Sequence, residues 1–240
     1  MRNGVIRLPV LSGLLLLISG AVFGQSPSGT YQEGIHYSVI PDATVKSDGP
    51  VEVVEAFSYL CTHCATFEPY VQSWKKRLPE HVEFKRIPVV FGRSSWELYA
   101  RAYATAEMMG IADESHPAMM DKLWKERDVM RDMDALGDFY AEFGADPAEF
   151  KAMSESFAVD AKMRRDQRRV QNAGVRGTPS LIVNGKYLVA GNAAVANFDV
   201  MLDVVDYLVA TEAAAMGATA EASAEGAEPE LAEAEAVAAD

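Results

Sequence analysis

Cysteine is scarce in this sequence: its 240 residues include only two, Cys61 and Cys64. Two thiols cannot build the framework of several disulfides that holds small secreted domains together, and they cannot supply a four-cysteine structural zinc site. There are only four histidines to complete a mixed zinc site, and none of them has the paired spacing typical of zinc ligands. The two cysteines are therefore expected to act as one pair.

Basic residues are also in deficit. The chain has 22 Lys and Arg against 35 Asp and Glu, which gives a formal net charge of −13 at pH 7. Proteins bind nucleic acid through a surplus of Lys and Arg, so this balance argues against a nucleic-acid partner. An apolar fraction of 49% with 24% charged residues is nevertheless typical of a globular protein.

Long apolar runs are absent after residue 23, so no later segment is expected to span a membrane. Residues 1–24 have the pattern of a secretory signal peptide: Arg2 and Arg7 precede an apolar stretch, and small residues lead to a cleavage site before Gln25. An uncleaved membrane anchor is the alternative, which the glycines within the stretch disfavour. The sequence therefore predicts export to a compartment where disulfides persist.

The carboxyl-terminal residues 211–240 lack Lys, Arg and aromatic side chains. They carry eight acidic residues, which account for eight of the thirteen net negative charges of the chain. Such a segment cannot bury enough apolar surface to fold, so we expect a disordered and solubilising tail. A role in docking a partner is the alternative.

The two cysteines follow a predicted strand and begin a predicted helix. Residues 51–58 are rich in β-branched and aromatic side chains, which favours a strand, and residues 65–78 show apolar side chains at the three- and four-residue spacing of an amphipathic helix. A second strand is predicted over residues 81–91, ending near Pro88.

Residues 95–172 have helical patterns almost throughout, and the run Gly174–Pro179 ends them. A hairpin of strands 180–183 and 187–190 is expected to follow, and a last helix over residues 194–210. This order predicts an α/β protein with an all-helical insertion. Its predicted divisions are 25–94 for the first part of the α/β domain, 95–173 for the helical insertion and 174–210 for the second part.

The spacing Cys61-Thr62-His63-Cys64 at a helix start favours redox chemistry. Two cysteines three apart lie on one side of the first turn, where backbone N–H groups and the helix dipole stabilise a thiolate. His63 adds a further donor. A structural disulfide is the first alternative, although a bridge that closes so short a loop adds little stability. Zinc or copper is the second.

Methionine is concentrated in the helical segment, which holds eight of the eleven methionines. Thioether sulfur is a ligand that copper accepts, so this concentration favours copper slightly over zinc as a possible metal. Core filling and a pliable peptide-binding surface are the more ordinary interpretations. The eight residues are Met108, Met109, Met119, Met120, Met130, Met133, Met153 and Met163.

Glu55 places a carboxylate on a predicted strand, on the same face as apolar Val53 and Phe57. Two interpretations stay open: a strand-edge side chain that reaches solvent, or a buried carboxylate behind the cysteine pair that handles the proton of Cys64. Arg86 on the next strand is either its partner or an ordinary surface arginine. The local sequence does not predict a cis bond before Pro179.

These motifs together resemble the DsbA family of exported thiol–disulfide oxidoreductases, within the thioredoxin-fold superfamily. The resemblance covers most of residues 31–208 and rests on three stretches: VVEAFSYLCTHCATFEPYV, RIPVVFGRSSWELYARAYATAE and VRGTPSLIVNGKYLV. It implies a thioredoxin fold with an inserted all-helical domain.

The resemblance also implies a role for individual residues. Cys61 matches the exposed nucleophile, Cys64 the buried resolving thiol, His63 the active-site histidine, Glu55 the buried acid and Pro179 a cis-proline. Thr62, Thr178 and Pro179 are then expected to contact substrate. Thr62 stands where proline is commonest in the family, and Thr178 where valine is common in its best-known members, and both positions tune the redox potential.

The expected function is that of a periplasmic, monomeric oxidase that donates the Cys61–Cys64 disulfide to reduced exported proteins through a mixed disulfide at Cys61. The resemblance implies a DsbB-type membrane quinone reductase as reoxidant, and no cofactor or metal beyond the cysteine pair. A reductase or isomerase kept reduced is the alternative within the same chemistry. The absence of a dimerisation domain before residue 31 weighs against a dimeric isomerase. A Met-rich periplasmic chaperone or copper-binding protein is the alternative of another class.

Overall fold

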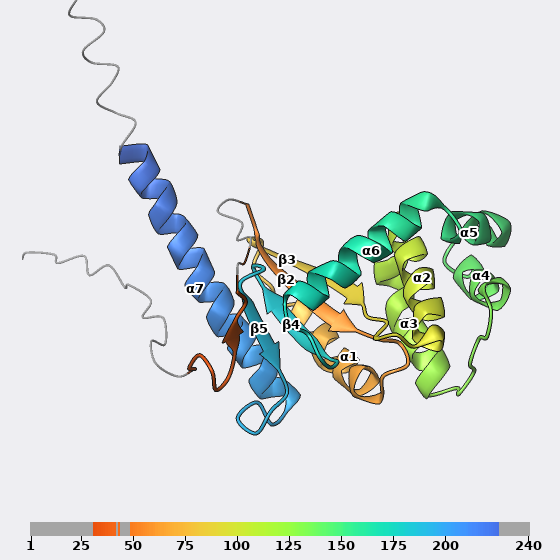
Figure 1. Ribbon diagram of the computed structural model, residues 1–240, viewed down its shortest axis with the longest axis horizontal. Coiled ribbons are helices and arrows are strands. Elements are labelled where there is room, and N and C mark those ends of the chain that lie inside the picture. The colour runs from red at the N-terminus through yellow and green to blue at the C-terminus, as the bar shows by residue number, and fades with distance from the viewer. Residues whose placement is uncertain (1–30, 42, 44–48, 226–240) are drawn as a thin grey trace, which may run out of the picture.

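A five-stranded mixed sheet forms the centre of the protein. The computed structural model describes residues 31–41, 43 and 49–225, so the predicted signal peptide 1–24 lies outside the described residues. The strand order is β1-β5-β4-β2-β3 (Figure 1), in which β2 and β3 are parallel and the other neighbours are antiparallel. The strands are β1 Ser38–Val39, β2 Val51–Phe57, β3 Val82–Pro88, β4 Ser180–Val183 and β5 Tyr187–Ala190.

The central strand β2 is buried along its whole length, and helices cover both faces of the sheet (Figure 1). On one face, α1 (Thr62–Lys75) and α7 (Phe198–Glu225) pack against Val53 and Leu181. On the other face, α6 (Phe157–Asn172) packs against Val54 and Ile182. Adjacent strand residues point to opposite faces, so one strand serves both apolar layers.

The inserted helices pack against the loop that carries the cysteines. Tyr59, Cys61 and Cys64 belong to one apolar cluster with side chains of the insertion, among them Tyr99 and Met119. The thioredoxin-like fold with a helical insertion is thus confirmed, and the site is held between its two parts. The inserted helices are α2 Ser94–Met108, α3 Ala112–Trp124, α4 Met133–Ala141, α5 Pro147–Ser154 and α6.

Four of the eight methionines in this segment are core residues. Met119, Met120, Met130 and Met163 are all buried, whereas Met108 is exposed. Core filling is therefore confirmed for these four, and they do not contribute to a pliable surface.

Two differences from the predicted elements have local causes. The predictions do not include β1, which is only two residues long and lies at the sheet edge. The last helix begins at Phe198, four residues later than predicted. The Asn192 side chain accepts hydrogen bonds from the Ala194 and Val195 amides and holds a turn there, and Asn197 then caps the helix by accepting from Val200 N–H.

The last helix also ends later than predicted. It continues to Glu225, so the prediction of a disordered tail from residue 211 is wrong for residues 211–225. Glu212 is only 2% exposed and accepts hydrogen bonds from Asn184 Nδ2 (2.7 Å) and Lys186 Nζ (2.8 Å). Ala213 and Met216 pack on the apolar cluster beneath. The predicted disorder of residues 226–240 concerns a stretch outside the described residues.

Despite its length, α7 is not apolar enough to cross a membrane, and neither is any other helix within the described ranges.

Glu212 tests the docking of this last helical segment. We expect Glu212→Ala to lower the free energy of unfolding by about 1–3 kcal/mol, because the buried Asn184 amide loses its acceptor. Urea unfolding followed by circular dichroism measures the change. The matched control is Asp138→Ala on α4, an exposed residue, which should stay within about 0.5 kcal/mol of the wild type. Equal stability of the two variants would contradict the docking.

Candidate active site

The cysteine pair lies where β2 gives way to α1. Cys61 is the residue that caps the amino terminus of α1, and its amide donates to the Ser58 carbonyl at 3.1 Å. Cys64 lies in the first turn and is completely buried, whereas Cys61 keeps 9% of its surface exposed. Both side chains are thiols here. Only Cys61 can therefore be reached by an attacking sulfur from outside.

The surroundings of Cys61 stabilise its thiolate. A hydrogen bond from the Cys64 thiol is the largest influence, and it outweighs burial, which acts in the opposite direction. The Thr178 side chain and the backbone N–H groups of Cys64 and His63 add further donors, and together they lower the pKa of Cys61 to about 5. At pH 7 the Cys61 thiolate is therefore lower in free energy than the protonated Cys61 thiol by about 3 kcal/mol.

Cys64 has the opposite character. Burial is the main cause that raises the pKa of the Cys64 thiol well above its ordinary value, and the negative charges of Glu55 and Cys61 add to it. The reduced pair is therefore one thiolate that keeps a small accessible surface and one completely buried thiol.

The segment before β4 brings a second part of the chain to Cys61. The Thr178–Pro179 bond is cis, as the family resemblance implies and the local sequence does not predict. The Cys61 thiol donates to the Thr178 carbonyl at 3.4 Å, across 117 positions of sequence. Thr178 thus offers the sulfur a carbonyl acceptor and a side-chain donor.

A groove of about 720 Å³ begins beside the pair. We call it the catalytic groove. His63, Thr178 and Pro179 line one end, while apolar side chains of α7 and β5, including Phe198, Met201 and Leu188, line the rest. Thr62 faces away from it, toward a smaller hollow between α1 and α3. The structure thus gathers His63, Thr178 and Pro179 at this groove but not Thr62, and their roles in substrate binding stay predictions.

Glu55 is a buried carboxylate. It is 1% exposed and accepts a hydrogen bond from Arg86 Nε at 2.9 Å. The solvent-facing interpretation of Glu55 and the surface interpretation of Arg86 are therefore wrong. Burial raises the pKa of Glu55 to about 7, against the opposing charge of Arg86 and with a contribution from Glu68. Its second oxygen, Oε1, is buried and has no hydrogen-bond partner within the described part of the chain.

The sequence analysis misses three members of this buried polar network: Glu68, His116 and Tyr59. Glu68 Oε2 accepts from Arg86 Nη2 at 3.0 Å and lies 3.2 Å from His116 Nε2, while His116 Nδ1 lies 3.1 Å from the Tyr59 hydroxyl. Glu68 stands four residues after Cys64, on the same side of α1, which is the one signal that could have indicated it. Nothing local indicates His116, which α3 contributes from the insertion.

The charges of the network can be assigned from these contacts. Burial lowers the pKa of His116 to about 4, helped by the charge of Arg86, so the ring is neutral at pH 7. The neutral ring then donates a hydrogen bond from Nε2 to Glu68 and accepts one at Nδ1 from the Tyr59 hydroxyl. Burial opposes the charge of Glu68, but the bond to His116, the charge of Arg86 and a bond from Gln72 hold the pKa of Glu68 below its ordinary value. Arg86 and Glu68 are the ionised pair, and Glu55 is free to take or release a proton near neutral pH.

Among the described residues, no group of three or more His, Cys, Asp or Glu side chains is placed to hold a metal ion.

Comparison with known proteins agrees with this geometry. The model of the family described as DSBA-like thioredoxin domain matches residues 52–203. The thiol:disulfide interchange protein DsbA of Pseudomonas aeruginosa PAO1 is 32% identical over 208 residues, which cover 86% of this chain and 97% of the relative. The DsbA of Azotobacter vinelandii is 31% identical, with 86% and 96% covered.

Solved structures of DsbA proteins are also similar to this chain. The crystal structure of oxidoreductase DsbA from Xylella fastidiosa is similar to this chain with a TM-score of 0.72 and 35% identity, covering 77% of this chain and 98% of that one. The crystal structure of Pseudomonas aeruginosa DsbA gives a TM-score of 0.70 and 32% identity, with 77% and 96% covered.

The Cys61 thiolate can be titrated directly. In the reduced protein, thiolate absorbance near 240 nm should rise with a midpoint at about pH 5. We expect Cys64→Ala to raise this midpoint, because it removes the largest single influence that stabilises the thiolate. Cys61→Ser is the control and should show no transition in this range. An unchanged midpoint in Cys64→Ala would exclude the assigned hydrogen bond.

Glu55 should make a pH-dependent contribution to stability. Its pKa is about 7 when folded against 4.5 for an ordinary glutamate, so the folded protein binds this proton more tightly than the unfolded chain does. The contribution is complete below pH 4.5 and is lost as the pH rises through about 7, by about 3 kcal/mol in total. Glu55→Gln lacks this group, so its stability relative to the wild type should increase by that amount over the same range.

Chemical unfolding of the reduced proteins at several pH values measures this difference. The contribution of His116, which has the opposite sign, is common to both proteins and cancels. Glu80→Gln, at an exposed position, is the control and should show no such trend. A constant difference between Glu55→Gln and the wild type from pH 4.5 to 7.5 would refute the raised pKa.

Proposed function

The chain belongs to the DsbA family of disulfide oxidoreductases, and we propose that within this family it acts as an oxidase of reduced exported proteins. The observation that carries the proposal is the unequal pair of thiols: the pKa of Cys61 is about 5, whereas burial raises that of Cys64. A thiol–disulfide pair donates its disulfide readily when its reduced form is stabilised. The stabilisation of about 3 kcal/mol at pH 7 corresponds to about 60 mV toward a more oxidising couple.

The reaction begins with the Cys61–Cys64 disulfide. A substrate thiolate attacks Cys61 Sγ, forms a mixed disulfide and releases Cys64 as the leaving thiolate. A second substrate thiolate then attacks the substrate sulfur of the mixed disulfide and releases the Cys61 thiolate. Two substrate thiols have been oxidised to a disulfide, and the enzyme disulfide has been reduced by two electrons.

Exposure determines which sulfur is attacked. Cys64 is completely buried, so an incoming thiolate can reach only Cys61. The low pKa of Cys61 also makes it the better leaving group in the second step, because a thiol of lower pKa leaves faster.

Glu55 supplies the proton for Cys64. The Cys64 thiolate is formed in a buried place where burial and the charge of Glu55 oppose it. A carboxyl group with a pKa of about 7 is half protonated at neutral pH and can give its proton to the stronger base. When Glu55 is ionised, its negative charge lies next to the positive charge of Arg86, which is also paired with Glu68.

Substrate binds along the catalytic groove. An unfolded segment has unpaired backbone groups and apolar side chains, and the groove combines the loop of Thr178 and Pro179 with an apolar floor from Phe198 and Met201. The reduced enzyme is reoxidised by a DsbB-type membrane quinone reductase, and both reactions occur in the periplasm after removal of residues 1–24.

The oxidation of a reduced test protein separates an oxidase from a reductase or isomerase. The wild type should oxidise the test protein, Cys61→Ser should lose this activity by at least a thousandfold, and the exposed Thr66→Ala on the same helix should keep it. Cys64→Ala has no enzyme disulfide to donate. When it is mixed with the oxidised form of the test protein, its Cys61 thiolate should attack the substrate disulfide and accumulate a mixed disulfide, which can be isolated after acid trapping. The proposal would be contradicted if the protein trapped from cells is mainly reduced, or if Cys61→Ser is as active as the wild type.

A further inference from the structure

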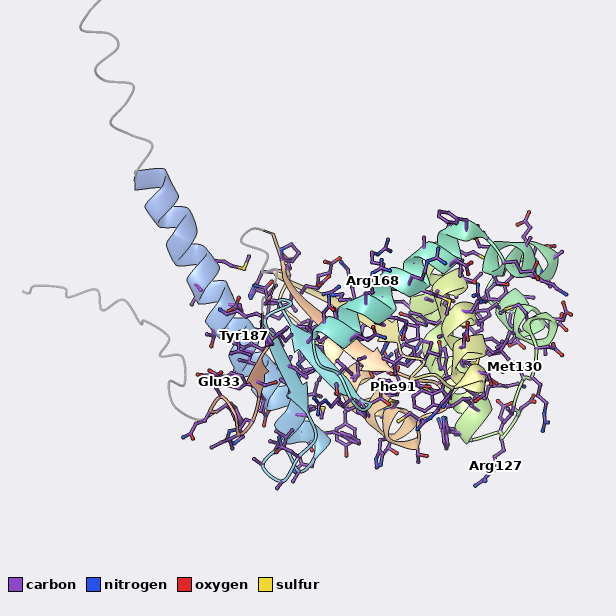
Figure 2. All side chains as sticks on the ribbon, viewed as in Figure 1. Glu33, Phe91, Arg127, Met130, Arg168 and Tyr187 are labelled. Carbon is purple, nitrogen blue, oxygen red and sulfur yellow. The ribbon has the colours of Figure 1, made fainter. Side chains whose placement is uncertain are left out.

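A second hollow of about 660 Å³ lies on the other face of the sheet. Ile40, Ala173 and Ile182 are among its apolar lining residues, and α6 contributes Arg165, Arg168 and Arg169. We call it the arginine groove. Arg168 can be located on α6 in Figure 2. No lining residue is shared with the catalytic groove, but the two grooves are neighbours: Ala173 of the arginine groove precedes Gly174 of the catalytic groove, and Ile182 pairs with Leu188.

Two of the three arginines have little or no ion pairing with described residues, so their charges can interact with a ligand. Arg169 is paired with Glu52, which also accepts from Lys85. Arg168 makes no ion pair with any residue in the described part of the chain, and Arg165 has only Asp166 at 3.9 Å. Arg165 and Arg168 lie nearly one turn apart on α6, which aligns them along the groove. A concentration of positive charge is exceptional in a chain of net charge −13.

We propose that the acidic segment 226–240 of this same chain binds in the arginine groove. The segment contains five carboxylates and no Lys or Arg, so its charge is opposite to that of the groove. It also contains Leu231 and Val237, which suit the apolar lining. The acidic residues are Glu228, Glu230, Glu233, Glu235 and Asp240.

The end of α7 places this segment within reach. Asn184 lines the arginine groove and donates to Glu212, so α7 passes beside the groove at that residue. The thirteen positions from Glu212 to Glu225 extend the helix by about 20 Å. Fifteen residues beyond Glu225 span up to about 50 Å when extended. The return over about 20 Å takes about six of them, so residues 231–240 can lie along the groove.

Attachment to the same chain is what makes such a contact effective. Ion pairs on a surface are individually weak and are screened by salt, but a tethered segment has an effective concentration near the millimolar range. The contact should therefore form at low ionic strength and disappear at high ionic strength.

Amide NMR spectra of the full-length chain test the contact. In 20 mM NaCl we expect the amides of residues 231–240 to shift relative to a synthetic peptide of residues 226–240, and the shifts to vanish by about 0.5 M NaCl. The double variant Arg165→Glu/Arg168→Glu should lose them already at 20 mM NaCl. Arg131→Glu, at an exposed position outside the groove, is the matched control and should keep them.

Three results would overturn the proposal. The first is that, at low salt, the amide chemical shifts of the segment in the wild-type chain equal those of the free peptide. The second is a set of shifts that persists in Arg165→Glu/Arg168→Glu. The third is a set of shifts that grows with protein concentration, which would assign the groove to the segment of a second copy. None of these results depends on redox activity. If the segment does not bind the groove, the proposed oxidase function is unaffected, and if the oxidase assay fails, the proposed binding of the segment is unaffected.

Discussion

The stabilisation of one thiolate at the start of α1 is the interaction on which the functional structure depends. Cys61 receives hydrogen bonds from the Cys64 thiol, from Thr178 and from the first amides of the helix, and these together outweigh the cost of burial. Each donor comes from a different constraint. The helix start supplies the amides, the two-residue spacing supplies the Cys64 thiol, and the cis-proline loop supplies Thr178. The sheet holds the loop against the helix because β4 pairs directly with β2.

Behind the pair, the fold maintains a buried charge where an apolar core would be simpler. Arg86 on β3 lies between Glu55 on β2 and Glu68 on α1, and His116 of the insertion completes the contact with Glu68. Removal of one partner from such a network leaves an uncompensated buried charge, which is strongly destabilising. The network therefore ties the insertion to the sheet, and it leaves Glu55 with a pKa of about 7 and close enough to Cys64 for its charge to raise the pKa of that thiol.

The protein presents two grooves of different character. The catalytic groove on the α1 and α7 side is mainly apolar and ends at the cysteine pair, as suits an extended substrate. The arginine groove on the α6 side is basic and lies beside the anchor of Glu212.

The sequence by itself determined whatever depends on neighbours along the chain. The strand before Cys61, the amphipathic helix after it, the hairpin at Asn184 and Gly185 and the redox character of the pair all follow from local patterns, and the family resemblance adds the cis bond at Pro179. Tertiary structure alone decided the rest. Burial of Glu55, its ion pair with Arg86, the neutral state of His116 and the extension of α7 through Glu212 all require residues between 28 and 57 positions apart to meet. A pKa or a helix end is set by desolvation and by partners in space, and these quantities exist only once the chain has folded.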